Sequence, residues 1–298
     1  AWSQGLGSGS ALVVVATQDN TNVTIRSTVD TPAGPNGMPA LIAGKDVVIP
    51  GLKRNDYIQV SSTKDLSSSW IFANAPVAVF GGHSCARVPD FATLECDHLE
   101  EQIFPIDTWG QHYIAARSPA RNNEPMFWRV LAAEDGTVVQ YKPPVSIGAE
   151  SKLDAGAFAE FTAPGDFEIT SNNGHPVLVA GYTFGCKSTN LPDCPGDPSM
   201  VLAVPVEQWL TDYVFLVDFS YTNDNVKLVR SKDKAVSLGC LAEIPDWSPI
   251  NDKYESAVVN INPGVGDCQP GTNTATGASP FSIMVVGESK QTSYAYPG

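Results

Sequence analysis

Two histidines and two cysteines that lie close together in the chain are the residues best suited to chemistry. They are His83, Cys85, Cys96 and His98, which read His-x-Cys and then Cys-x-His. Two thiolates and two imidazoles can close a tetrahedral zinc site, and residues i and i+2 of a strand face the same side. The same two thiols can instead form one disulfide, with the histidines beside it.

A second copy of this cysteine loop favours the disulfide. Cys186 and Cys194 lie in the matching loop about one hundred residues later, where the positions that correspond to the histidines are Phe184 and Gly196. A cysteine pair that recurs without its histidines behaves as a disulfide. Closing such a short loop stabilises a fold by roughly 2–3 kcal/mol. We therefore expect a disulfide in both loops and keep the zinc site as the weaker alternative.

The six cysteines form three pairs of sequence neighbours. Six cysteines allow about 15 pairings, but short loops have the lowest closure entropy. Disulfides form and persist in oxidising compartments, so we expect an extracellular or cell-surface protein. The expected pairs are Cys85–Cys96, Cys186–Cys194 and Cys240–Cys268.

Carboxylates are concentrated in "CDHLEEQ", directly after the first cysteine loop. Two carboxyl groups that face one pocket can share a proton or flank a glycosidic bond. A hydrolase that uses Asp97, Glu100 and Glu101 is therefore one interpretation. We favour a solvated segment, because nothing in the sequence sets the separation of these carboxyl groups.

The second cysteine loop, "CKSTNLPDCPGDPSM", is another candidate site. Asn190, Asp193 and Asp197 offer the oxygen ligands that calcium prefers, but they lack EF-hand spacing. We favour an ordinary surface loop, keep Asp193 and Asp197 as candidate binding residues, and expect no cofactor, with calcium as the alternative.

Aromatic residues have two interpretations. Trp109 and Trp209, with Tyr113 and Tyr213, could stack on carbohydrate, but their repetition favours core anchors at equivalent points of related units. Trp247, in the proline-flanked "IPDWSPI", is not repeated. It is therefore the better candidate for an exposed contact residue.

Two passages one hundred residues apart share a pattern. They are "PIDTWGQHY" (105–113) and "PVEQWLTDY" (205–213). The segments before them, "APVAVFGGHSC" (75–85) and "HPVLVAGYTFGC" (175–186), each open a buried strand with Pro-Val-x-Val and end it at a glycine. "SPFSIMVVGESKQTSYAYPG" (279–298) resembles a third proline-initiated strand.

A further repeat has the pattern of a β-hairpin. "VVATQDNTNVTI" (14–25) matches "VLAAEDGTVVQY" (130–141), and "VDFSYTNDNVKLV" (217–229) is a weaker third copy. Asp-Asn and Asp-Gly suit the positive-φ positions of a tight turn. We expect a hairpin at each of these places.

Composition agrees with an all-β protein. Of the 298 residues only 17% are charged, and 25 glycines and 23 prolines are spread along the chain. A net charge of −14 without clustered Lys and Arg argues against nucleic acid as a partner. No apolar run is long enough to predict a membrane span.

We therefore expect an all-β fold of three related β-units, each a sandwich or a blade-like sheet, packed into one compact disulfide-containing body. The repeat places the units near 1–108, 109–208 and 209–298, within a single module that covers 1–298.

Several segments resemble a known family. "PVAVFGGHSCARVP", "CDHLEEQIFPIDTWGQHYI", "RVLAAEDGTVV" and "SYAYPG" look like the IgGFc-binding protein N-terminal domain family, and more closely like its bacterial modules; the similarity extends from Val13 to Gly298. The resemblance implies an extracellular module of a longer protein. It supplies no catalytic residues.

The function expected from these observations is a non-enzymatic binding or adhesion module that presents loops to a protein or glycan at a surface. Nucleophile-elbow, P-loop and dinucleotide-binding motifs are absent from the sequence. One alternative is a subunit of an extracellular filament or surface layer, which self-associates through donated terminal strands. The second alternative is the hydrolase of the Asp97, Glu100 and Glu101 patch.

Overall fold

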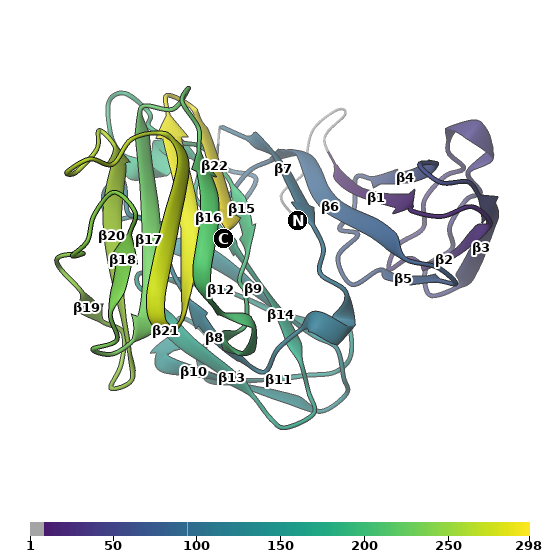
Figure 1. Cartoon of the computed structure of the whole chain (residues 1–298). Helices are drawn as coiled ribbons and strands as arrows, with labels where there is room; N and C mark the ends of the chain where they lie inside the picture. Colours follow the sequence, from purple (N-terminus) through teal and green to yellow (C-terminus); the bar gives the residue numbers. More distant parts are fainter. Residues whose placement is uncertain (1–8, 94) are drawn as a thin grey trace. The chain divides into compact units, whose positions relative to one another are not determined.

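Antiparallel β-strands dominate the computed structural model, which describes residues 9–93 and 95–298 (Figure 1). Strands account for 54% of the chain and helix for 4%, so the predicted all-β class is confirmed. The described residues contain no helix with the length and apolar character to cross a membrane.

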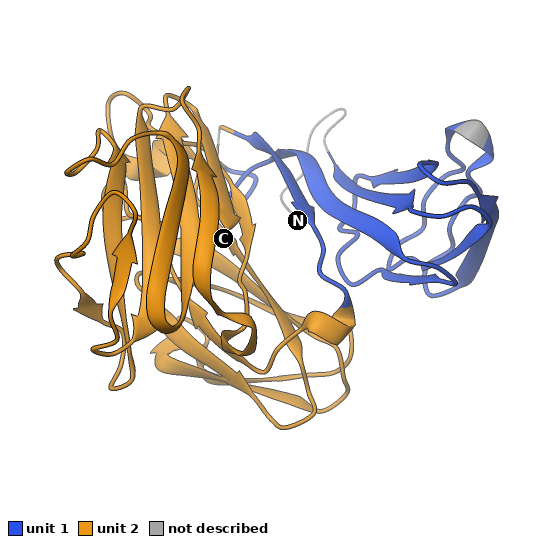
Figure 2. Ribbon diagram, in the orientation of Figure 1, with its two compact units in different colours: residues 1–92, 96–105 blue, residues 93–95, 106–298 orange. Residues whose placement is uncertain are grey.

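The chain divides into two compact units, coloured separately in Figure 2. Unit 1 comprises residues 1–92 and 96–105, and unit 2 comprises residues 93–95 and 106–298.

Unit 1 is a two-layer sandwich of a four-stranded and a three-stranded sheet. The four-stranded sheet has the order β4 (Tyr57–Ser62), β1 (Ser10–Ala16), β6 (Val77–Ala86) and β7 (Asp97–Gln102). The second sheet has the order β3 (Asp46–Leu52), β2 (Thr21–Arg26) and β5 (Trp70–Ala73), and the 3-10 turn η1 (Pro35–Gly37) follows β2. The side chains of Leu12, Val14, Val23 and Ile25 form the core.

Unit 2 contains a second sandwich of two four-stranded sheets. One sheet has the order β11 (Gly148–Leu153), β10 (Thr137–Val145), β13 (Phe167–Ser171) and β8 (His112–Ala115). The other has the order β12 (Phe158–Ala163), β9 (Met126–Ala132), β14 (Val177–Tyr182) and β15 (Met200–Leu202). Trp128 and Phe167 make an edge-to-face contact in its core. The 3-10 turns here are η2 (Ile106–Thr108), η3 (Cys186–Thr189) and η4 (Val206–Gln208).

The remaining strands of unit 2 form a third sandwich around one strand with two arms. They are β16 (Leu210–Val217), β17 (Asn223–Ser231), β18 (Val236–Leu238), β19 (Ser248–Pro249), β20 (Tyr254–Asn262), β21 (Gly271–Ser289) and β22 (Thr292–Pro297). The first arm of β21 pairs with β16 and β18, and its second arm pairs with β17 and β22. The arms meet at Gly277, where a Cβ atom would lie 2.6 Å from the Phe281 ring, so only glycine fits this corner.

The three sandwiches repeat one strand order. The sheet that carries the proline-initiated strand runs β4-β1-β6-β7, then β12-β9-β14-β15, then β20-β17-β21-β22. Pro76, Pro176 and Pro280 each stand directly before the equivalent strand or arm. The internal repeat read from the sequence is therefore a repeat of topology.

The predicted hairpins are wrong in one respect. β1 and β2 lie in different sheets, and so do β9 and β10, so each tight turn carries the chain from one layer of a sandwich to the other. Both strands of each pair bury alternate side chains in the same core from opposite sides. The expected positive φ is present at Asn20 (+59°) and Gly136 (+68°).

The third copy of this turn is not at residues 217–229. β16 and β17, which that segment joins, do not pair and correspond to β8 and β9. The equivalent connection is β17 to β18, where Asp233 has a φ of +61°. An Asn-Asp pair at residues 223–224 gave the misleading likeness.

Two tyrosines lock equivalent points of unit 2. Tyr113 accepts a hydrogen bond from the Gly110 N–H (2.8 Å) and donates one to the Val177 carbonyl (2.6 Å). Tyr213 accepts from the Leu210 N–H (2.9 Å) and donates to the Phe281 carbonyl (2.6 Å). Each hydroxyl thus ties the start of one strand, β8 or β16, to the residue that follows the strand-initiating proline, Pro176 or Pro280.

The second and third sandwiches share β21 as a wall. In its second arm, Met284 and Val286 enter the core of the second sandwich, while Ile283 and Val285 enter the core of the third. Each buried side chain of this kind contributes about 1.5–3 kcal/mol. The nearby ion pair of Lys227 with Asp166 (2.7 Å) also joins the two sandwiches.

Removing either tyrosine hydroxyl should destabilise unit 2. Tyr113→Phe and Tyr213→Phe each leave an amide and a carbonyl without their partner, and we expect a loss of about 1–3 kcal/mol in the free energy of unfolding. Urea unfolding followed by tryptophan fluorescence measures this loss. Tyr57→Phe, at an exposed tyrosine, is the control and should change little; equal effects at all three positions would contradict the role given to the hydroxyls.

Candidate functional site

The structure contains the three disulfides expected from the sequence, Cys85–Cys96, Cys186–Cys194 and Cys240–Cys268. The thiols of Cys85 and Cys96 are therefore bonded to each other in the structure, an arrangement that offers no thiolate to the alternative zinc site. Among the described residues, no group of three or more His, Cys, Asp and Glu side chains is arranged to hold a metal ion.

The two histidines beside the first disulfide lie in different environments. His83 is buried, and its Nδ1 accepts a hydrogen bond from the Cys85 N–H (3.1 Å). Burial lowers the pKa of His83 and favours the neutral ring. His98 is exposed, and its Nε2 lies 3.5 Å from Glu100. The pair therefore has no common site.

The acidic segment does not form a catalytic pair. Asp97, Glu100 and Glu101 lie on β7, where alternation puts Glu100 and Glu101 on opposite faces of the strand. Glu100 is exposed. Glu100 therefore cannot flank one bond together with Asp97 or Glu101. Asp97 shares a face with Glu101 but lies four residues away, about 13 Å along the strand, which exceeds the roughly 5–9.5 Å between the carboxyl groups of glycosidases.

The two acidic residues of the second cysteine loop differ in solvent exposure. Asp193 is exposed, whereas Asp197 is buried. The Asp197 N–H donates to Ser293 (2.9 Å), and the Asp197 carbonyl accepts from Thr183 (3.0 Å). Asp197 thus belongs to the fixed interior base of the loop, and Asp193 to its surface.

A buried arginine holds this loop in place, which the sequence did not reveal. Arg121 donates to the carbonyls of Phe184 (2.7 Å) and Pro195 (3.2 Å), at either end of the loop. Its Nε lies 3.1 Å from Glu124 and 3.8 Å from Glu288. Two carboxyl groups therefore share one guanidinium in the interior of unit 2.

Sharing one cation leaves Glu288 short of stabilisation. Burial is the main reason that its pKa rises to about 7, and the charge of Glu124 adds to the rise; Arg121 and a hydrogen bond from Asn223 oppose it. Glu124 receives several hydrogen bonds from backbone and Arg121, which hold its pKa below the ordinary value against the opposing effect of burial.

The tryptophans have structural contacts. Trp209 is buried, donates to the Val204 carbonyl (3.3 Å) and packs edge-to-face on Tyr254, as expected of a core anchor. Trp109 is half-buried. Trp247 is also half-buried, under the Arg230 guanidinium at 3.6 Å, and its role as a contact residue remains a prediction.

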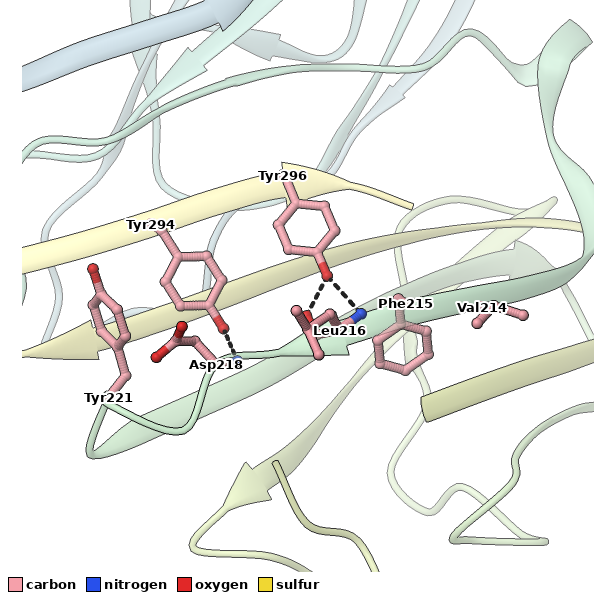
Figure 3. A pocket seen from close by; sticks show the side chains of 7 residues that line it. All are labelled: Val214, Phe215, Leu216, Asp218, Tyr221, Tyr294 and Tyr296. Carbon is pink, nitrogen blue, oxygen red and sulfur yellow. Dashed lines mark hydrogen bonds between the residues drawn. The ribbon is translucent and has the colours of Figure 1, made fainter. Parts of the chain in front are cut away.

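An open groove of about 520 Å³ lies on the third sandwich, between β16 and β22 (Figure 3). Its lining is mostly aromatic and aliphatic. Tyr294 and Tyr296 are two apart on β22 and so point to the same side. Their rings are nearly parallel, with centroids 6.2 Å apart, and Tyr221 meets Tyr294 edge-on at 4.7 Å. The lining residues are Val214, Phe215, Leu216, Asp218, Tyr221, Tyr294 and Tyr296.

Hydrogen bonds hold the two tyrosines of β22 in position. Tyr296 accepts from the Leu216 N–H (3.0 Å) and donates to the carbonyl of the same residue. Tyr294 accepts from the Asp218 N–H (3.3 Å) and donates to buried Asp224 (2.9 Å). Figure 3 shows Tyr296 reaching from β22 to Leu216 on β16, and Tyr294 reaching to Asp218 directly after that strand. A ligand that meets these rings has little side-chain ordering to impose.

Exposed apolar side chains extend the groove along β16. Val214, Leu216 and Phe219 are 76%, 56% and 76% exposed. On β16 the alternate residues Tyr213, Phe215 and Val217 point into the core. We call the exposed side of β16, with Phe219 and the tyrosine groove, the β16 face. Large apolar side chains exposed together on one side of a strand are a feature of interaction sites.

The charge of the β16 face has one sign. Residues 210–224, 271–289 and 291–298 contain no Lys or Arg. Asp212 and Asp218 are exposed there, and two hydrogen bonds from Ser220 lower the pKa of Asp218, so its carboxylate is charged at neutral pH.

Sequence reasoning placed none of these groove residues in a site. The signal was present in "SYAYP", where Tyr-x-Tyr on a strand must put two rings on one face. What the sequence did not show is that β22 lies beside the edge of β16, because that contact joins segments about eighty residues apart in the chain.

The fold and the groove define a class: a disulfide-containing β-sandwich repeat protein with an apolar and aromatic candidate site. The model of the family described as IgGFc binding protein matches residues 2–287. The chain belongs to this family. Over 194 residues, or 64% of its length, it is 29% identical to the human protein named IgGFc-binding protein, of which it spans 3%. No solved structure matches the chain. Family and disulfides fit a secreted or extracellular protein.

The raised pKa of Glu288 makes a component of stability depend on pH. The folded state holds this proton more tightly than the unfolded chain does, so the free energy of unfolding falls as pH rises from about 4.5 to about 7, by about 3 kcal/mol. Glu288→Gln should remove this component. Urea unfolding at pH 5, 6, 7 and 8 measures it as the difference between wild type and variant.

The exposed Glu243→Gln variant controls for the loss of one carboxylate elsewhere. Stability curves of wild type and Glu288→Gln that run parallel across this pH range would contradict the assignment.

Proposed function

We propose that this chain is a non-enzymatic, extracellular protein-binding module that docks its partner on the β16 face. The observation that carries the proposal is the exposure of Val214 and Leu216 on one side of β16 beside fixed tyrosine rings, with exposed Phe219 two residues beyond the strand. Protein interfaces concentrate aromatic side chains in a central contact surrounded by a polar rim. The family membership supports a binding role.

A protein suits this face better than a glycan does. Tyrosine rings alone would serve either ligand, because sugars also stack on aromatic faces. Val214 and Leu216 add aliphatic surface that offers sugar hydroxyls no hydrogen bond, and such surface gains free energy only from an apolar partner. The filament alternative stays open as a case in which the bound protein is another subunit.

The name of the human relative gives a first probe. That protein is named for binding IgG Fc, and Fc is accordingly one candidate partner of this chain. The matched segment is a small part of that protein, so a wider panel of secreted and cell-surface proteins belongs in the same experiment.

Removing apolar contacts from the β16 face should abolish binding. We expect wild type to bind immobilised Fc or another protein of the panel, and the Leu216→Ala/Phe219→Ala variant to bind at least tenfold more weakly, because hot-spot truncations commonly cost more than about 1.4 kcal/mol. Biolayer interferometry measures the affinities. Both substitutions are at exposed positions, so circular dichroism should be unchanged.

The matched control is Phe91→Ala/Val258→Ala, which removes two exposed apolar side chains outside the β16 face. Equal losses in both variants would show that the face is not the site. Binding on a glycan array together with silence on the protein panel would contradict a protein partner.

A further inference from the structure

β16 carries an open backbone edge within the β16 face. It lies at the end of its sheet and pairs only with β21 among the described residues. In an antiparallel pair, alternate residues direct both N–H and C=O toward the neighbour, and the residues between direct them outward. Leu216 bonds the Tyr296 hydroxyl through both groups, so it is an outward residue. Val214, two positions away, is outward as well.

The partner strand gives the same assignment independently. Val214 stands opposite Thr274. The Thr274 carbonyl accepts a hydrogen bond from the Gly239 N–H (2.9 Å), on the side of β21 away from β16. The pair of Val214 and Thr274 is therefore not hydrogen-bonded within the sheet. Within the described part of the chain, no hydrogen bond reaches the outward N–H and C=O of Val214.

The tyrosines cover only part of this edge. Tyr296 and Tyr294 occupy the backbone groups of Leu216 and Asp218, which blunts the edge at that end. Asp212 and Val214 keep an uncovered stretch directly beside the groove. An edge with free backbone groups accepts an added strand, in which main-chain hydrogen bonds supply affinity and side-chain contacts supply specificity.

Resting on the proposed function, we propose that the β16 face binds an extended, basic polypeptide segment that adds to the edge of β16 at Val214. The main chain of the segment exchanges two hydrogen bonds with Val214. Its apolar side chains cover Leu216 and the tyrosine rings, and its Lys or Arg side chains face Asp212 and Asp218. Arginine also stacks on tyrosine faces.

The negative charge of the β16 face favours a basic segment over a second copy of the chain as the bound partner. Two copies paired through β16 would bring together two faces whose charged side chains are all acidic, on chains with a net charge of −14 each. Like charges across an interface oppose association. A basic segment gains from the same field.

A proline at position 214 tests the main-chain contact. It removes the outward N–H, which the sheet does not use, and prolines are tolerated on edge strands in that orientation. Val214→Ala is the matched control, because it shortens the side chain and keeps the N–H. The probe is a phage-displayed random dodecapeptide library selected on the immobilised wild-type chain. Enriched peptides are synthesised and their affinities measured by fluorescence anisotropy.

We expect enriched peptides in which Lys or Arg alternates with apolar residues. Val214→Pro should weaken their binding at least tenfold, and Val214→Ala less than threefold. Asp212→Asn/Asp218→Asn should weaken binding and reduce its dependence on salt, since exposed charges are screened. This double variant tests the proposal even where Val214→Pro proves unfolded by circular dichroism.

The outcomes separate the two proposals. Neutral or acidic peptides that lose binding to Leu216→Ala/Phe219→Ala, but bind Val214→Pro normally, would overturn the basic added strand and leave the proposed function standing. Peptides insensitive to every variant of the face, or no enrichment at all, would overturn the added strand, whereas the proposed function falls only if Leu216→Ala/Phe219→Ala binds the protein panel as wild type does. A dimer in sedimentation equilibrium that Val214→Pro dissociates would identify a second copy as the occupant and overturn the basic segment.

Discussion

The burial of both faces of one strand holds unit 2 together. The second arm of β21 sends Ile283 and Val285 into one core and Met284 and Val286 into another, so two sandwiches have a single wall between them. Strands that are buried on both faces, which are typical of parallel sheets, have continuous apolar sequence. The run "IMVV" has this character, although β21 is antiparallel to its neighbours. The corner at Gly277 follows from this arrangement, because the strand must leave one layer to enter the wall. The Tyr213 hydroxyl then fixes the corner by bonding the Phe281 carbonyl.

Much of the architecture was accessible from the sequence, because it rests on local signals. The proline-initiated strands mark equivalent points of all three sandwiches, and the recurring Trp-x3-Tyr marks equivalent points of the second and third. The cysteine spacing indicated which thiols pair. The hairpins failed because a tight turn has the same residues whether it joins strands of one sheet or of two. Alternation at Val14 and Val23 is compatible with either arrangement, and only pairing with distant strands decides between them.

The candidate site could not be predicted from local sequence signals. Tyr294 and Tyr296 are recognisable as one-sided, but their groove exists only because β22 lies along the edge of β16. The reactive groups that stand out in the sequence, such as His83 and Glu100, lie in separate environments: His83 is buried and Glu100 is exposed. The surface that remains is apolar, aromatic and acidic, which is the chemistry of recognition. Family membership agrees with that interpretation.

The shared wall also has a consequence for how this architecture can be inherited. A sandwich whose core is built from its own strands alone, as in unit 1, keeps that core when it is duplicated or moved between genes. The two sandwiches of unit 2 lack that freedom, since removing residues 209–298 would strip Met284 and Val286 from the core that stays behind. Recombination that preserves folding must therefore transfer residues 106–298 together. Surface loops and edge strands can still change in sequence.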